Sequence, residues 1–209
     1  MPGTIEECVV VTGFGPFQGH DINASWEAVK LLPELESEEQ LGVKLIVMKL
    51  PVAYEDVVKM IPAIWTDHKP MLVIHVGVSG LADKITLEKV AHRSGYKKAD
   101  IFGQLPAEGE CCLGCSDEAC SSLDVEQICC KLNESECGLT SSVSSNAGRY
   151  LCEFTYYSSL SIDNSRTLFI HVPDLNKPYS ALELARGIKQ IISIILNDIR
   201  GTDQTTNHM

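Results

Sequence analysis

The sequence predicts an α/β sandwich built on a mostly parallel sheet. Short apolar runs that end at glycine alternate along the chain with stretches of helical period, the pattern of strand–helix–strand units. The 209 residues fit one domain, residues 1–209, and 44% hydrophobic against 22% charged residues is a composition that supports a buried core. In such folds, ligands bind outside the carboxyl ends of the strands. We therefore expect functional residues in the loops that follow the strands.

The first half of the chain predicts four strands and two helices. The strands are short apolar runs at 6–12, 43–48, 71–76 and 85–91. A loop rich in glycine and proline, 13–19, follows the first of them. One helix is expected from residue 23 or 25 to residue 32, where Pro33 ends it. Another is expected over 55–65, with a kink at Pro62.

The second half begins with an irregular stretch. Residues 93–138 lack periodicity and are rich in glycine, serine, cysteine and acidic residues, so they predict a surface loop with a short helix around 125–132. A helix over 146–157 and a strand over 167–172 follow. The last helix opens with a capping box of Ser180 and Glu183, and its apolar residues share one face. These residues are Ala181, Leu184, Ala185, Ile188, Ile191, Ile192, Ile195 and Ile199. The polar tail, 201–209, is expected to be flexible.

The charge balance limits the possible partners. Seventeen basic against 28 acidic residues give a net charge of −11, and phosphate contacts need a basic face, so we expect no nucleic-acid partner. No apolar run reaches the roughly 18 residues that span a bilayer, so we expect no membrane partner. The acidic N-terminus lacks the apolar region of a signal peptide, which predicts a cytoplasmic protein with reduced cysteines.

The loop at 13–19 has two interpretations that remain open. Its pattern is GxGxxxG, which differs from the GxGxxG of dinucleotide loops, and Pro16 and two phenylalanines would crowd a pyrophosphate. The loop is either a structural turn or the wall of an apolar pocket made by Phe14 and Phe17.

A cysteine cluster lies in the irregular stretch. Cys112 and Cys115 form a CxxC pair, but no second pair and no histidine accompany them. The other members are Cys111, Cys120, Cys129, Cys130 and Cys137. Zinc or redox chemistry is possible for such a cluster, whereas free thiols on a loop explain the incomplete spacing better. We expect no metal and no cofactor.

Three further residues carry chemistry only if they meet. A helix that starts at residue 146 places Cys152 beyond its first turn, where the helix dipole helps a thiolate little. By itself Cys152 is either an inert buried thiol or a nucleophile. His171 at a strand end is either a core residue or a base, and Glu88 is either a solvated charge or the partner of a base. Hydrolysis by a cysteine nucleophile needs a thiol, an imidazole that takes its proton and a group that orients the imidazole. His75, inside an apolar strand, is interpreted as structural.

Several motifs together resemble the pyroglutamyl-peptidase I (pyrrolidone-carboxylate peptidase) family of cysteine peptidases. They run in the family's order and spacing from about residue 9 to residue 199. The matching segments are VTGFGPF at 11–17, NASW at 23–26, HVGVSG at 75–80, TLEK at 86–89, AGRYLC at 147–152 and FIHVP at 169–173. The resemblance implies a three-layer α/β/α sandwich with a central, mostly parallel, twisted sheet. It also implies a cysteine exopeptidase that hydrolyses the amide bond after an N-terminal pyroglutamyl residue through a thioester.

The resemblance also implies roles for individual residues. Cys152 would be the nucleophile, His171 the general base, and Glu88 the group that orients the imidazole. The implied pocket residues are Phe14, Phe17, Asn23, Tyr150 and Leu151. Many bacterial members have an arginine linked to the oxyanion where this chain has Lys98, and a glutamine where it has Val78. The implied partners are peptides with an N-terminal pyroglutamate. The stretch 93–138 covers the region through which bacterial subunits contact one another, and its sequence differs from that of the bacterial members. A monomer is therefore expected.

Overall fold

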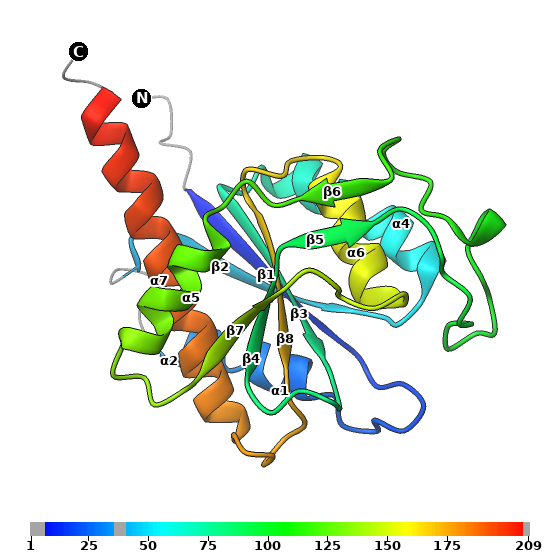
Figure 1. Ribbon diagram of the computed structural model, residues 1–209, viewed down its shortest axis with the longest axis horizontal. Coiled ribbons are helices and arrows are strands. Elements are labelled where there is room, and N and C mark those ends of the chain that lie inside the picture. The colour runs from blue at the N-terminus through cyan, green and yellow to red at the C-terminus, as the bar shows by residue number, and fades with distance from the viewer. Residues whose placement is uncertain (1–6, 36–40, 207–209) are drawn as a thin grey trace.

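The computed structural model describes residues 7–35 and 41–206. Within them a six-stranded sheet has the order β2-β1-β3-β8-β4-β7 (Figure 1). The strands are β1 (Cys8–Phe14), β2 (Lys44–Leu50), β3 (Leu72–Val78), β4 (Ile85–Glu88), β7 (Ser141–Ser144) and β8 (Thr167–Val172). A second, two-stranded sheet pairs β5 (Val90–His92) with β6 (Glu118–Cys120). The mostly parallel sheet expected from the sequence is confirmed.

One strand of the larger sheet runs against the others. β4 is antiparallel to β8 and parallel to β7, whereas β1 is parallel to β2 and β3, and β3 to β8. β3 and β4 are neighbours along the chain, but β8 lies between them in the sheet. β8, the strand that carries His171, therefore lies between β3 and β4, although both precede it in the sequence by nearly half the chain.

Helices cover both faces of this sheet, which confirms the three-layer sandwich (Figure 1). One face packs against α1 (Ala24–Val29), α2 (Leu32–Leu35), α5 (Val125–Glu134) and α7 (Ala181–Thr206). The other face packs against α4 (Tyr54–Ala63) and α6 (Leu151–Leu160). The short helices η1 (Ile64–His68) and η2 (Ala107–Gly109) complete the elements. No helix of the described residues is both long and apolar enough to cross a bilayer.

Several predicted boundaries in the first half need correction. β2 and β3 each begin one residue later and end two residues later than expected. β1 continues through Phe14, so the loop starts two residues later than expected; the predicted start at residue 6 lies outside the described residues. The first helix ends at Val29, and Pro33 sits in the first turn of α2, where a missing N–H is tolerated. Pro62 is inside α4, which continues as the π-helix η1. The predicted strand 85–91 is two strands in different sheets, separated at Lys89.

The second half needs corrections of the same kind. The helix expected from residue 146 begins at Leu151, and the strand β7 was not predicted. Within 93–138 the helix around 125–132 is confirmed as α5, and β6 adds an element to the expected loop. The capping box is confirmed, since Glu183 N donates to Ser180 Oγ at 3.3 Å and Ser180 N to Glu183 Oε2 at 2.8 Å. Residues 201–206 extend α7, and residues 207–209 lie outside the described residues, so the flexibility of the tail stays a prediction.

Candidate active site

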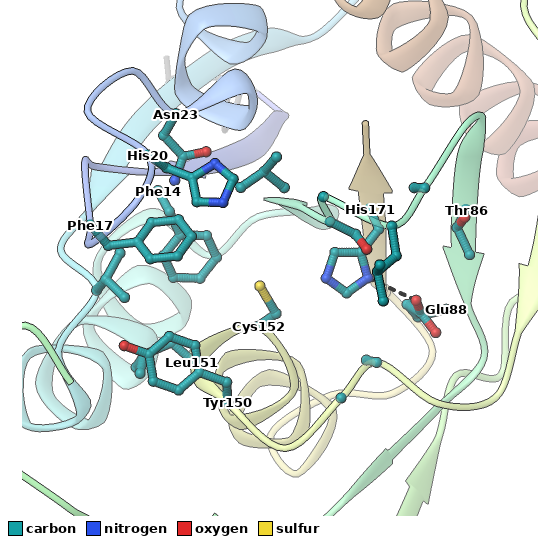
Figure 2. A pocket seen from close by; sticks show the side chains of 18 of the residues that line it. Phe14, Phe17, His20, Asn23, Thr86, Glu88, Tyr150, Leu151, Cys152 and His171 are labelled. Carbon is teal, nitrogen blue, oxygen red and sulfur yellow. Dashed lines mark hydrogen bonds and ion pairs between the residues drawn. The ribbon is translucent and has the colours of Figure 1, made fainter. Parts of the chain in front are cut away.

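A cavity of about 600 Å³ opens at the carboxyl ends of β1, β3 and β8. It gathers every site residue predicted from the sequence, although their segments are spread over most of the chain (Figure 2). They are Phe14, Phe17, Asn23, Glu88, Lys98, Tyr150, Leu151, Cys152 and His171. In Figure 2 the sulfur of Cys152 lies between the ring of His171 and the rings of Phe14 and Phe17.

The register between β4 and β8 brings Glu88 to His171. Thr86 pairs with His171 in this antiparallel ladder, and Glu88, two residues further, points to the same face of the sheet. Glu88 is therefore a diagonal neighbour of the histidine, a separation that a long side chain can bridge. Its Oε1 accepts a hydrogen bond from His171 Nδ1 at 2.8 Å, and both side chains are buried. The Nδ1 proton is thus fixed, which leaves Nε2 for chemistry.

The start of α6 places Cys152 in the first helical turn, contrary to the sequence-based expectation. Gly148 has φ of +83°, and its N–H donates to Asn146 Oδ1 at 3.3 Å, so residues 146–148 form a turn that a helix cannot include. Tyr150 is the N-cap, with φ of −143°, and Cys152 is the second residue of the helix. Unpaired N–H groups and the positive end of the helix dipole favour a negative charge at this position.

Two negative neighbours determine the charge of His171. Burial of the imidazole acts to lower its pKa, but the thiolate of Cys152 and the carboxylate of Glu88 outweigh that effect and raise the pKa of His171 from 6.5 to about 10. The arrangement therefore favours a protonated His171 beside Cys152 at neutral pH. A neighbouring cation of this kind favours the reactive, deprotonated form of a cysteine.

Gly77 on β3 was missed by the sequence analysis, which ended this strand at residue 76. A Cβ atom at this position would lie 2.6 Å from Cys152 Sγ and 2.8 Å from Phe169 Cζ. The sulfur therefore occupies the space that any other side chain on β3 would fill. A glycine inside an apolar strand is the signal for such a close approach.

The apolar side of the cavity is built by the loop after β1 and by the start of α6. Phe14 and Leu151 are buried, and Phe17 and Tyr150 are half-buried. Asn23 is buried behind this wall, where its Nδ2 donates to Gly15 O at 2.9 Å and its Oδ1 accepts from Ser25 N at 3.1 Å. Its polar atoms are used to cap α1 and to hold the loop, so Asn23 shapes the pocket from behind.

Lys98 reaches the cavity through an aromatic contact. Its Nζ lies 4.4 Å from the centre of the Tyr150 ring, a cation–π arrangement. Tyr54 Oη donates to the Lys98 carbonyl oxygen at 2.9 Å, and Tyr150 Oη donates to Ala99 O at 3.2 Å. The segment at 98–99 is thus fixed against the pocket. Val78 also lines the cavity.

His75 has the structural position expected for it. The ring is fully buried on β3, and its Nδ1 lies 2.8 Å from Thr12 Oγ1 on β1. Burial lowers the pKa of His75 from 6.5 to about 3, so it is neutral in the folded protein.

A buried ionic cluster next to Cys152 was not predicted. The side chain of Glu153 is fully buried on α6, and both its oxygens accept hydrogen bonds from Arg149 Nη1, at 2.8 and 2.6 Å. His92 Nδ1, on β5, lies 2.8 Å from Glu153 Oε1. Burial raises the pKa of Glu153, and its contacts with His92 and Arg149 oppose that effect. The cluster ties the first turn of α6 to the smaller sheet.

The cysteines of the irregular stretch lie apart from this cavity. Cys112, Cys115, Cys120 and Cys130 are exposed thiols, whereas Cys111 is buried with its Sγ 3.2 Å from Ser158 Oγ. Across the described ranges 7–35 and 41–206, no three or more His, Cys, Asp or Glu side chains are grouped to hold a metal ion.

A family model described as pyroglutamyl peptidase matches residues 7–188 of the chain. The chain belongs to the pyroglutamyl peptidase family. This confirms the family inferred from the motifs, and with it the class of enzyme. A human relative in the family, pyroglutamyl-peptidase 1, is 42% identical over 203 residues, which cover 97% of this chain and 96% of the relative.

Archaeal members of the pyroglutamyl peptidase family are also similar. The pyrrolidone-carboxylate peptidase of Thermococcus onnurineus is 32% identical and covers 92% of this chain and 98% of its own. A solved structure of a mutant pyrrolidone carboxyl peptidase from the hyperthermophile Pyrococcus furiosus superposes with a TM-score of 0.81 at 25% identity. That match covers 91% of this chain and 99% of the other.

Proposed function

We propose that this chain is a cysteine exopeptidase that hydrolyses the amide bond after an N-terminal pyroglutamyl residue. Cys152 is the nucleophile, His171 the general acid and base, and Glu88 the group that orients the imidazole. The observation that carries the proposal is the 2.8 Å contact between Glu88 and His171 beside a cysteine in the first turn of a helix. The names of the relatives support the substrate class.

The first step is attack by the thiolate. Cys152 Sγ forms a bond to the pyroglutamyl carbonyl carbon, and the carbonyl oxygen becomes an oxyanion. The N–H groups in the first turn of α6 point out of the helix without intrahelical acceptors, so they supply the donors for that oxyanion. Lys98 adds a positive charge at the pocket wall; its contribution to the oxyanion is a prediction.

The remaining steps return the enzyme to its starting state. The imidazolium of His171 gives its proton to the leaving amine as the C–N bond breaks, which leaves a thioester on Cys152. A water molecule then attacks the thioester carbonyl, and His171 accepts one proton from it. Collapse of the second tetrahedral intermediate releases pyroglutamate and restores the thiolate–imidazolium pair. Glu88 keeps the ring oriented through both halves of the cycle.

The acyl pocket explains why a cyclised N-terminus fits. Pyroglutamate is a flat, neutral lactam, and the rings of Phe14 and Phe17 offer aromatic walls of suitable shape. Because the polar atoms of Asn23 are engaged with Gly15 and Ser25, backbone groups of the loop are the better partners for the lactam edge.

An assay with a fluorogenic pyroglutamyl amide tests the proposal. Wild-type protein cleaves it, Cys152→Ala abolishes turnover, and the exposed-thiol control Cys130→Ala retains it. Iodoacetamide labelling with peptide mapping should find one fast-reacting thiol, Cys152. Fast labelling confined to the cysteines of 111–137, with no turnover, would favour a redox module instead. The single domain, the monomeric state and the cytoplasmic location stay predictions.

A further inference from the structure

The turn that carries Phe17 is attached to the molecule at two places. We call residues 15–20 the Phe17 turn. At its base, Gly15 N donates to Leu50 O at 2.8 Å, and the Gly15 carbonyl accepts from Asn23. The turn closes on itself, since His20 N donates to Phe17 O at 2.8 Å and Phe17 N to His20 O at 3.2 Å. Gly19, with φ of +85°, allows this reversal.

The tip of the turn is attached through His20. Its ring stacks on the ring of Phe17, with centres 4.5 Å apart and planes at 21° (Figure 2). On its other side, His20 Nδ1 lies 3.4 Å from Asp174 Oδ1, and both side chains are about three-quarters buried, at 25% and 30% exposure. We call this contact the His20–Asp174 pair.

Asp174 belongs to the segment that carries the catalytic histidine. It follows the end of β8 by two residues and His171 by three. The pair therefore joins the two sides of the cavity: the wall of the acyl pocket on one side and the segment after the general base on the other. Phe17 and His20 both line the cavity.

We propose that the His20–Asp174 pair is a positioning element for substrate binding, which holds the ring of Phe17 against the acyl pocket. The inference rests on the proposed function, because it takes Phe17 as a wall for the pyroglutamyl ring. Asp174 fixes the imidazole of His20, and the imidazole fixes the phenyl ring by stacking. Neither residue touches the reacting atoms, so the pair acts on KM and leaves the chemical step unchanged.

Single and double variants test the pair. The His20–Asp174 pair is partly exposed, so its loss should have a moderate effect. Asp174→Ala should raise KM for a pyroglutamyl amide about three- to tenfold, with kcat within about twofold of wild type. His20→Phe keeps a stacked ring but removes the pair, so it should raise KM equally. The double variant should be no worse than either single one. The control is Lys177→Met, whose Nζ lies 3.8 Å from the other oxygen of Asp174 and is mostly exposed.

The route through Phe17 has its own test. In a Phe17→Ala background, Asp174→Ala should change KM by less than about twofold, because the ring that the pair positions is gone. Additive effects of His20→Phe and Asp174→Ala, or an equal effect of Asp174→Ala with and without Phe17, would overturn the inference, since Asp174 would then act directly on the substrate.

Hydrogen exchange separates this inference from the proposed function, because it needs no substrate. The amides of Phe17 and His20 should exchange faster in Asp174→Ala than in wild type, while those of α6 stay unchanged. Unchanged exchange at the Phe17 turn contradicts the inference even if pyroglutamyl amides are cleaved. A wild-type protein that cleaves none of them contradicts the proposed function instead.

Discussion

The proton on His171 is the residue-scale property on which the proposed chemistry depends. An imidazolium is needed to protonate the leaving amine, and the raised pKa keeps the ring charged up to about pH 10. Activity that depends on this proton is therefore retained at neutral pH and is lost as the pH rises through that value. Glu88 is one of the two groups that hold the proton in place.

Glu88→Gln should move the alkaline limb of the kcat/KM profile to lower pH and reduce its plateau. The neutral amide removes one of the negative charges that raise the pKa of His171, so the ring loses its proton earlier. His171→Ala should lower kcat/KM by about 100-fold or more, because the group that transfers the proton is gone. Profiles from pH 6 to about 11 measure both effects. Exposed His68→Gln is the control; a Glu88→Gln profile that overlays wild type would contradict the assigned role.

Gly77→Ala tests the space that Cys152 occupies. Its methyl group must displace either the sulfur or the buried ring of Phe169, and a misplacement of about 1 Å costs on the order of 100-fold in rate. We expect kcat/KM and the iodoacetamide rate at Cys152 to fall together. Gly80→Ala, in the same glycine-rich segment, is the matched control, because its Cβ meets nothing closer than 3.8 Å. Equal activities of the two variants would show that the close approach is unimportant.

At the scale of elements, the position at which α6 starts decides the environment of Cys152, the proposed nucleophile. A helix was expected from residue 146, but the turn formed by Asn146 and Gly148 delays its start by five residues, to Leu151. The sequence could not show that Glu153 is buried, because its partner His92 comes from a distant strand. The result is a first turn anchored by a buried carboxylate.

Arg149→Met should lower the free energy of unfolding by about 1–3 kcal/mol, because it leaves the buried Glu153 with less charge compensation. Burial raises the pKa of Glu153, so protonation relieves the unpaired charge as the pH falls. The loss should thus be smaller at acidic pH than at neutral pH, and Arg149→Met/Glu153→Gln should recover part of it. Urea unfolding at both pH values measures this. Lys59→Met, which breaks the exposed i,i+4 pair with Glu55, should change stability little.

At the scale of the whole molecule, the cavity combines apolar side chains with a positively charged group, the imidazolium of His171. Phe14, Phe17 and Leu151 line the cavity and, in the proposed mechanism, surround the acyl group, while His171 carries a positive charge on the same cavity. An open N-terminal residue would bring an ammonium group into this setting. Burying such a charge without a partner costs several kcal/mol, about 100-fold or more in selectivity.

Pyroglutamyl amides should therefore be cleaved with a kcat/KM at least about 100-fold above those of prolyl, glutaminyl and glutamyl amides. Proline has the ring, but it carries a charged secondary amine and lacks the lactam carbonyl. A series of fluorogenic amides measures this. Phe14→Ala should raise KM while leaving the labelling rate of Cys152 unchanged. Comparable kcat/KM values for prolyl and pyroglutamyl amides would show that the pocket has been assigned wrongly.

Much of the architecture could be predicted from periodicity, because strands such as β1, β3 and β8 are buried on both faces and form continuous apolar runs. The site residues came from motif resemblance, since spacing alone could not bring residues 88, 152 and 171 together. The role of Gly77 had a local signal, a glycine in an apolar run, but the antiparallel direction of β4 and the short polar strand β7 depend on contacts between distant segments. Local patterns carry no signal for those.

The insertion of β8 between β3 and β4 has a consequence for biosynthesis. A growing chain that ends before residue 167 contains the proposed nucleophile and the proposed orienting carboxylate, but it lacks the proposed general base. It also leaves β3 and β4 with open edges. The last strand to leave the ribosome therefore closes the sheet and completes the catalytic machinery in the same event. In the proposed mechanism, the order of the strands therefore delays activity until the core is assembled.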